Sequence, residues 1–247
     1  MRIRTGAALA LALWGSAVQA GITARYASPL GSRPLIVETG DAGDFRIGFE
    51  GDDSRLLRSE GRDYLIVAED GEVQIVPLAD LAAVLLRTPL SDTALRDFDK
   101  DLDPADRRTL KAVPTGVSRA GTRSVAGQAG IAYRVGYTID GQPHAETVIA
   151  SQAEAMRPLA DAWRRAGEAF AVVVGAPPFR RAYPGLDRLS VLIAQITGQG
   201  ALLDAPMLAT LRTIRLDATP TEDRFDLPGP PLGQAELEDM IRTAGDR

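Results

Sequence analysis

The sequence predicts an α+β fold in which an antiparallel β-sheet packs against several helices. Short segments that alternate apolar and polar residues follow one another with only tight turns between them. Strands arranged in this way pair antiparallel. Segments with helical spacing are grouped apart from them, so the strand–helix alternation that builds a parallel sheet is missing.

The first strands are expected to form a meander. Alternation is clear in residues 22–26 and 45–49, where every second residue is apolar. Asp70-Gly71 is a strong hairpin signal. The strands expected here are residues 22–26, 35–38, 45–49, 56–58, 64–67 and 73–76.

Helical spacing begins after Pro77 and predicts a helix over residues 78–87. A second helix is expected after Ser151, with Ser151 as its N-cap and Glu154 completing a capping box. Pro158 favours a start near itself or a kink there. The other elements expected are helices over residues 186–196 and 234–243 and strands over residues 124–129, 131–139, 143–150, 208–216 and 224–227.

Residues 1–20 have the three parts of a secretory signal. Arg2 and Arg4 are cationic, residues 6–14 are apolar, and small residues lead to Ala20. A membrane anchor would need about 20 apolar residues, more than this run offers. We therefore expect cleavage after Ala20 and a periplasmic location.

Residues 21–247 are expected to form a single α+β domain. The chain has no cysteine, so it can form neither a disulfide nor a lipid-modified cysteine. With one histidine as well, soft zinc ligands are nearly absent, and we expect no metal and no cofactor. The net charge of −5 disfavours a general attraction to nucleic acid.

His144, the one histidine, follows Pro143 beside an expected turn. Every Ser-His-Asp scheme would have to use it, and no serine lies in a Gly-x-Ser-x-Gly motif. We expect His144 to be an exposed turn residue and the chain to have no catalytic residues.

The acidic segment 97–106 resembles a calcium loop in part. With Asp99 at position 1, Asp101 and Asp103 fall at positions 3 and 5. Position 6 is then Pro104 instead of glycine, and position 12 is Leu110 instead of glutamate. The prediction is a solvated acidic face, either on a helix over residues 104–111 or within a linker.

Glycines gather at 116–130 and at 198–200 without the pattern that cradles phosphates. We expect turns and bulges at these positions.

The remaining pattern in the sequence is a set of aliphatic side chains. We expect these side chains to fill a core, with a cavity that an open barrel lines for an acyl chain as the alternative. They are Leu56, Ile66, Val73, Ile75, Val84, Leu85, Val191, Leu192, Ile193 and Leu202.

Five short segments carry a resemblance to a known family: residues 22–26, 44–47, 63–67, 124–128 and 224–228. In this order they resemble the LolA/LppX-like superfamily of exported bacterial proteins, in particular its outer-membrane lipoprotein-sorting-like members. The resemblance implies an incomplete β-barrel wrapped over helices, with a hydrophobic interior that takes lipid. The long acidic middle and the few aromatic residues depart from the carriers, and no functional residue is transferred.

We therefore expect an exported, non-enzymatic protein that binds a lipid or a lipidated partner in a half-barrel. The alternative is an envelope interaction or scaffold protein, whose surface meets another protein. A hydrolase would require a serine and a carboxylate beside His144.

Overall fold

The computed structural model describes residues 21–29, 31–40, 43–69, 71–87, 112–176, 186–218 and 220–243. The expected signal (1–20) and the acidic segment (97–106) lie outside them. The strands are β1 (Ile22–Ala27), β2 (Leu35–Thr39), β3 (Phe45–Phe49), β4 (Arg55–Ser59), β5 (Arg62–Glu69), β6 (Glu72–Pro77), β7 (Val113–Val125), β8 (Gln128–Ile139), β9 (Gln142–Ser151), β10 (Ala201–Ala205) and β11 (Ala209–Arg215). The helices are α1 (Leu78–Arg87), α4 (Arg157–Val174), α6 (Leu186–Thr197) and α7 (Gln234–Thr243), with short 3₁₀ helices η2 (Glu154–Met156) and η3 (Glu222–Phe225).

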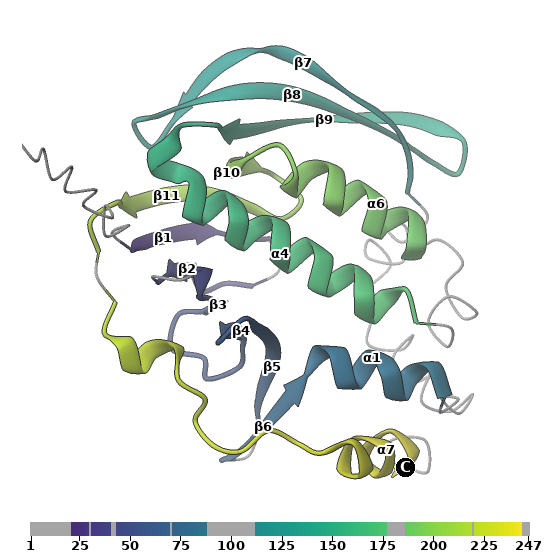
Figure 1. The fold of residues 1–247 in the computed structure, drawn as a ribbon. Helices are drawn as coiled ribbons and strands as arrows, with labels where there is room; N and C mark the ends of the chain where they lie inside the picture. Colours follow the sequence, from purple (N-terminus) through teal and green to yellow (C-terminus); the bar gives the residue numbers. More distant parts are fainter. Residues whose placement is uncertain are drawn as a thin grey trace, which may run out of the picture.

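The described strands form one antiparallel sheet of 11 strands in the order β6-β5-β4-β3-β2-β1-β11-β10-β9-β8-β7. The sheet curves around α4 and α6 and does not close, because its edge strands β6 and β7 are not paired with each other (Figure 1). The predicted α+β class, a curved antiparallel sheet or incomplete barrel packed against helices, is confirmed. We call the face that carries α1, α4 and α6 the inner face and the opposite one the outer face.

The predicted meander is confirmed in β1 to β6. Each of these strands pairs with the next one along the chain. Gly51, Gly61 and Gly71 stand in the turns with positive φ angles, which glycine adopts at little cost. Helix α1 has the predicted bounds.

The predicted strand over residues 124–129 is wrong, because a hairpin turn lies inside it. Ala126 and Gly127 have φ angles of 48° and 77° and join β7 to β8. Two successive positive φ angles are typical of the tight turn that suits the twist of paired strands. The expected bulges are present in β7, where the register shifts next to Gly116 and Gly121.

Two other predictions are wrong, and one strand was missed. Helix α4 begins at Arg157 after η2 and has no side-chain cap, so the capping box at Ser151 is wrong; Pro158 stands in the first turn, where its missing N–H costs no hydrogen bond. Residues 224–227 are not a strand, since η3 occupies the first of them. Strand β10 was not predicted at all.

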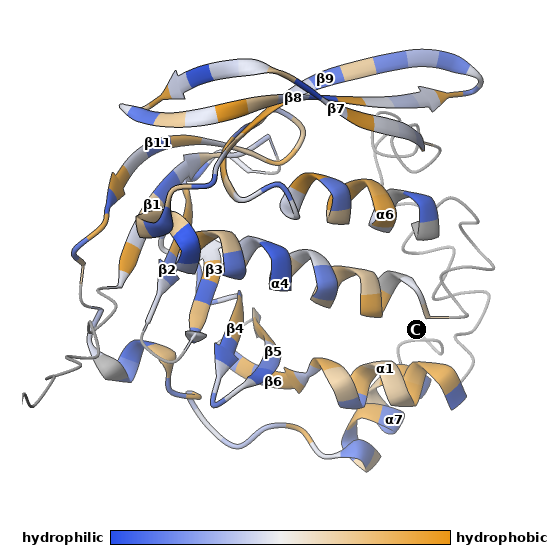
Figure 2. Cartoon of the chain, turned by 45° about the horizontal axis from the view of Figure 1, so that its top comes forward, coloured by the Kyte–Doolittle hydropathy of each residue, from blue (hydrophilic) through white to orange (hydrophobic). Residues whose placement is uncertain are grey.

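The main core lies between the inner face and the helices α4 and α6. In Figure 2, hydrophilic and hydrophobic residues alternate along α4, as in a helix with one face on a sheet. Most of the aliphatic side chains expected in the core are buried or half-buried, but Val73 and Val191 are exposed. Among the described residues, no helix is both long enough and apolar enough to cross a membrane.

The chain between β11 and α7 lies against the outer face. Phe225 packs there with Leu57 and Ile66. Further along, the amide of Leu232 donates a hydrogen bond of 2.8 Å to the carbonyl of Ile75. This segment therefore covers part of the outer face, over β4 to β6.

Candidate functional site

A row of apolar side chains crosses seven strands of the inner face. The pairing register places each residue of the row directly opposite the next. Neighbours in such a row share a face, because successive side chains along a strand point to opposite sides. The row, which we call the inner row, consists of Ile214, Ala24, Val37, Ile47, Leu56, Leu65 and Val76.

Helices cover the inner row at two places and leave its middle open. Ala24 and Val37 are fully buried in the core that α4 completes. Val76 is buried with Val84 of α1. Between them, Leu65 is 38% exposed. The partly uncovered part of the row thus lies on β3 to β5, between α4 and α1.

An ion pair lies beside the partly uncovered part of the inner row, which we call the strip. Arg58 and Asp63 stand opposite each other one row further along the inner face, and their side chains are joined at 2.7 Å. The Arg58 side chain is only 14% exposed. A partly buried charge beside an apolar strip gives a binding site one polar end.

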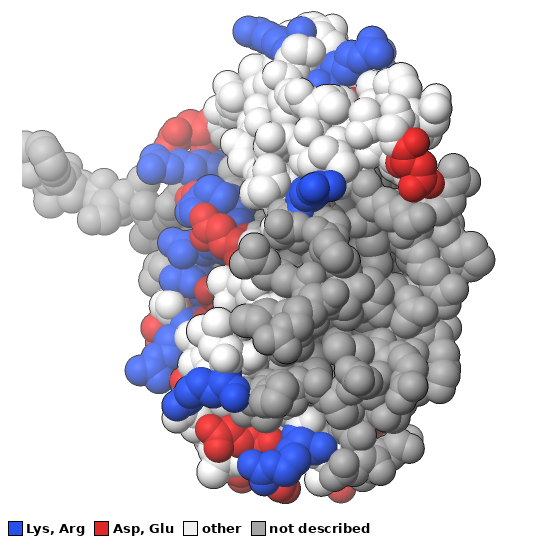
Figure 3. Space-filling view, turned by 90° about the vertical axis from the view of Figure 1, so that its right-hand side faces the viewer, with Lys and Arg blue, Asp and Glu red and all other residues white. Residues whose placement is uncertain are grey.

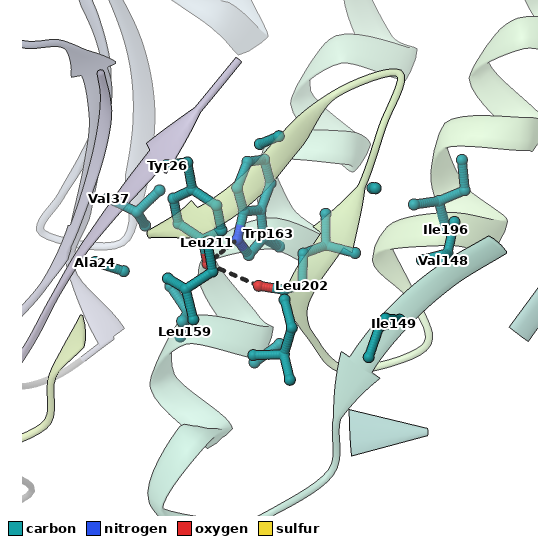
Figure 4. Packing of buried hydrophobic residues seen from close by; sticks show 14 of the residues in the cluster. Ala24, Tyr26, Val37, Val148, Ile149, Leu159, Trp163, Ile196, Leu202 and Leu211 are labelled. Atoms are coloured by element: carbon teal, nitrogen blue, oxygen red, sulfur yellow. Dashed lines mark hydrogen bonds between the residues drawn. The ribbon is translucent and has the colours of Figure 1, made fainter. Parts of the chain in front are cut away.

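Aromatic side chains hold α4 on the sheet. Trp163 of α4 meets Tyr26 of β1 edge to face, with ring centroids 5.4 Å apart and an interplanar angle of 87°. The Trp163 Nε1–H donates to the Tyr26 hydroxyl at 3.1 Å, and that hydroxyl donates to the Leu202 carbonyl at 2.8 Å (Figure 4). The buried phenol of Tyr26 thereby joins α4, β1 and β10.

The region under α4 and α6 is filled. Gly167 of α4 lies so close to α6 that a Cβ there would stand 2.7 Å from Oγ1 of Thr197. Three of the pockets in the described part of the chain are lined neither by α4 or α6 nor by the inner row. The expectation of a packed core is met under these two helices.

Burial raises the pKa of Tyr26 far above its usual value. An unfolded tyrosine loses its proton near pH 10, whereas the folded one keeps it. The contribution to stability is thus complete below about pH 10 and is lost as the pH rises further. Between about pH 9 and about pH 11, the free energy of unfolding should fall more steeply for the wild type than for Tyr26→Phe. Urea denaturation at both pH values checks this, and equal slopes would contradict it.

The sequence-predicted candidates do not gather in the structure. His144 on β9 is exposed and stacks on Tyr137, with ring centroids 5.6 Å apart. The nearby carboxylate of Glu146 accepts a 3.0 Å hydrogen bond from the Tyr137 hydroxyl. This pairing brings a phenol and a carboxylate near the imidazole but includes no serine.

Sequence reasoning missed the two features that define the site. The apolar run 64–67 before the Asp70-Gly71 turn predicted a strand around Leu65, but the row that Leu65 belongs to depends on the register of seven strands. Trp163 was expected on its helix, whereas its partner Tyr26 lies 137 residues away in sequence.

Neither a family model, nor a curated protein, nor a solved structure matches this chain.

Proposed function

We propose that this chain is an exported, periplasmic, non-enzymatic protein that binds the acyl chain of a lipid or of a lipidated partner on the inner face of its half-barrel. The observation that carries the proposal is Leu65, 38% exposed in the middle of a row of apolar residues. The likeness to lipoprotein-sorting-like proteins and the signal expected in residues 1–20 support the same function.

The inner row suits an acyl chain because its apolar residues follow one another in a line across the strands. Neighbouring strands lie about 4.8 Å apart, so the three half-covered residues Ile47, Leu56 and Leu65 span about 10 Å across the sheet. A chain laid along them removes apolar surface from water on both partners, at roughly 0.8 kcal/mol for each buried CH₂ group. The Arg58–Asp63 pair lies beside this strip, where the polar end of a lipid can face it.

Placing a charge in the row should abolish this binding. In Leu65→Asp, a carboxylate replaces the exposed leucine, and we expect acyl affinity to fall at least about tenfold, since burying a leucine is worth about 1.5–3 kcal/mol. Displacement of a fluorescent fatty acid measures the affinity.

The matched control is Val73→Asp. Val73 is 50% exposed on the neighbouring strand β6, opposite Ala68, and its alternation with Val76 places it on the outer face. Affinity should stay within about twofold of the wild type there, because the inner row is untouched. Equal losses in both variants, or a wild type that binds no fatty acid, would refute the proposed site.

A further inference from the structure

A groove of about 540 Å³ crosses the outer face, away from the inner row. It runs over β11, β1, β2, β3 and β4 and is bounded by the segment that carries η3. Its uncharged lining includes Thr23, Ile36, Gly48, Pro220 and Thr221. The volume lies in the range of small-molecule sites, roughly 300–1,000 Å³.

The groove is positively charged although the chain as a whole is negative. More arginines than carboxylates line it, whereas the net charge of the chain is −5. On the face drawn in Figure 3, by contrast, basic and acidic side chains are interleaved. The arginines are Arg25, Arg46, Arg55, Arg215 and Arg224, and the carboxylates are Glu38, Glu50 and Asp52.

Three of the arginines pair with two carboxylates within the groove. Glu38 is only 3% exposed and pairs with Arg46 at 2.5 Å and also with Arg224. Arg25 pairs with Glu50. These pairs fix the walls of the groove, and because Glu38 is shared by two arginines they leave part of the excess positive charge in place.

Arg55 and Arg215 form no ion pair in the described parts of the chain, although the charge of the nearby Asp53 carboxylate acts on Arg55. Arg55 Nη1 donates to the Asp53 carbonyl at 2.8 Å, but its Nε is buried without a hydrogen-bond acceptor. Burial, and then the neighbouring charge of Arg46, lower the pKa of Arg55. A partly buried guanidinium beside a second one is stabilised by an anion.

We propose that this groove binds the phosphate group of a small organic phosphate, with Arg55 as its direct contact. A phosphate carries a charge of about −1.5 to −2 at pH 7, which matches the excess of two arginines over carboxylates in the whole lining of the groove. The guanidinium group of arginine can donate two parallel hydrogen bonds to the oxygens of a phosphate, one from Nε and one from Nη. The groove is larger than a bare phosphate needs, so its remaining length accommodates an organic part. This inference goes beyond the proposed function and concerns the other face of the sheet.

Calorimetric titration of the chain purified from a bacterial periplasm tests it, with inorganic phosphate, glycerol 3-phosphate and acetate as probes. Glycerol 3-phosphate should bind, and Arg55→Gln should weaken it at least about tenfold through loss of a charged hydrogen bond. Arg123→Gln, at an exposed position of β7, removes the same charge outside the groove and should leave the affinity unchanged. Arg215→Gln alters an exposed side chain of the groove, and we expect it to weaken binding several-fold. It serves as a second test if Arg55→Gln fails to fold.

Two sources of the phosphate are separated by flotation with phosphatidylcholine vesicles that contain phosphatidic acid. Binding of glycerol 3-phosphate without flotation supports a soluble phosphate ester, and Arg55-dependent flotation supports a lipid headgroup. Equal weakening in Arg123→Gln, equal affinity for acetate, or no binding of any phosphate probe would overturn the proposal. Leu65→Asp should keep its phosphate affinity, so this result and that of the acyl-chain test are independent.

Discussion

Replacing Trp163 by alanine is expected to lower the free energy of unfolding by about 3–5 kcal/mol, the usual cost of truncating a buried aromatic side chain. The indole is only 6% exposed and packs against Tyr26. Its removal leaves a cavity between α4 and the sheet and takes away the donor that the Tyr26 hydroxyl accepts from. Chemical denaturation followed by far-ultraviolet circular dichroism measures the loss.

Trp163→Phe separates the packing from the hydrogen bond. It keeps most of the ring but has no N–H, so we expect a loss of about 1–2 kcal/mol. If Trp163→Ala costs less than about 1 kcal/mol, α4 is not seated on β1 in solution, and the covered end of the inner row is misplaced.

Replacing Phe225 by alanine should cost about 3 kcal/mol and release the segment that covers the outer face. The phenyl ring is buried with Leu57 and Ile66. It also lies so close to Gly40 that a Cβ on this glycine would stand 2.6 Å from Cε2 of the ring. Little space is therefore available for the site to collapse around alanine.

Hydrogen exchange shows where this loss acts. The Leu232 amide, bonded to the Ile75 carbonyl, should exchange faster in Phe225→Ala, while amides of β8 and β9 stay protected. Phe225→Leu keeps most of the apolar volume and should cost about 1 kcal/mol. Unchanged exchange at Leu232 would show that Phe225 does not hold the segment. Because Arg224 and Thr221 line the groove, phosphate binding should also weaken in Phe225→Ala.

Local patterns predicted the first half of the fold because its strands pair with their neighbours in sequence. Alternation within 45–49 and the Asp70-Gly71 turn were enough to predict a meander. The central pairing of β1 with β11 joins residues far apart in sequence, such as Thr23 and Arg215, and no local signal specifies it. Strand β10 is short, apolar and without alternation, so nothing in its sequence distinguished it from a loop.

Both proposed sites depend on strand order, which is why the sequence could not reveal them. Alternation already implied that Arg25 and Arg46 point away from the core. Only the sheet shows that they share one groove with Arg55 and Arg215. Val73 was misassigned for a similar reason: it alternates like a core residue, but β6 is an edge strand and this end of it is exposed.

The most direct test of the central claim is native mass spectrometry of the chain purified from a bacterial periplasm, followed by lipid extraction and by titration with a fatty acid. We expect the wild type to carry a bound acyl species that Leu65→Asp lacks and Val73→Asp retains. A bare mass for the wild type, with no uptake on titration, would contradict acyl binding and favour interaction with another envelope protein.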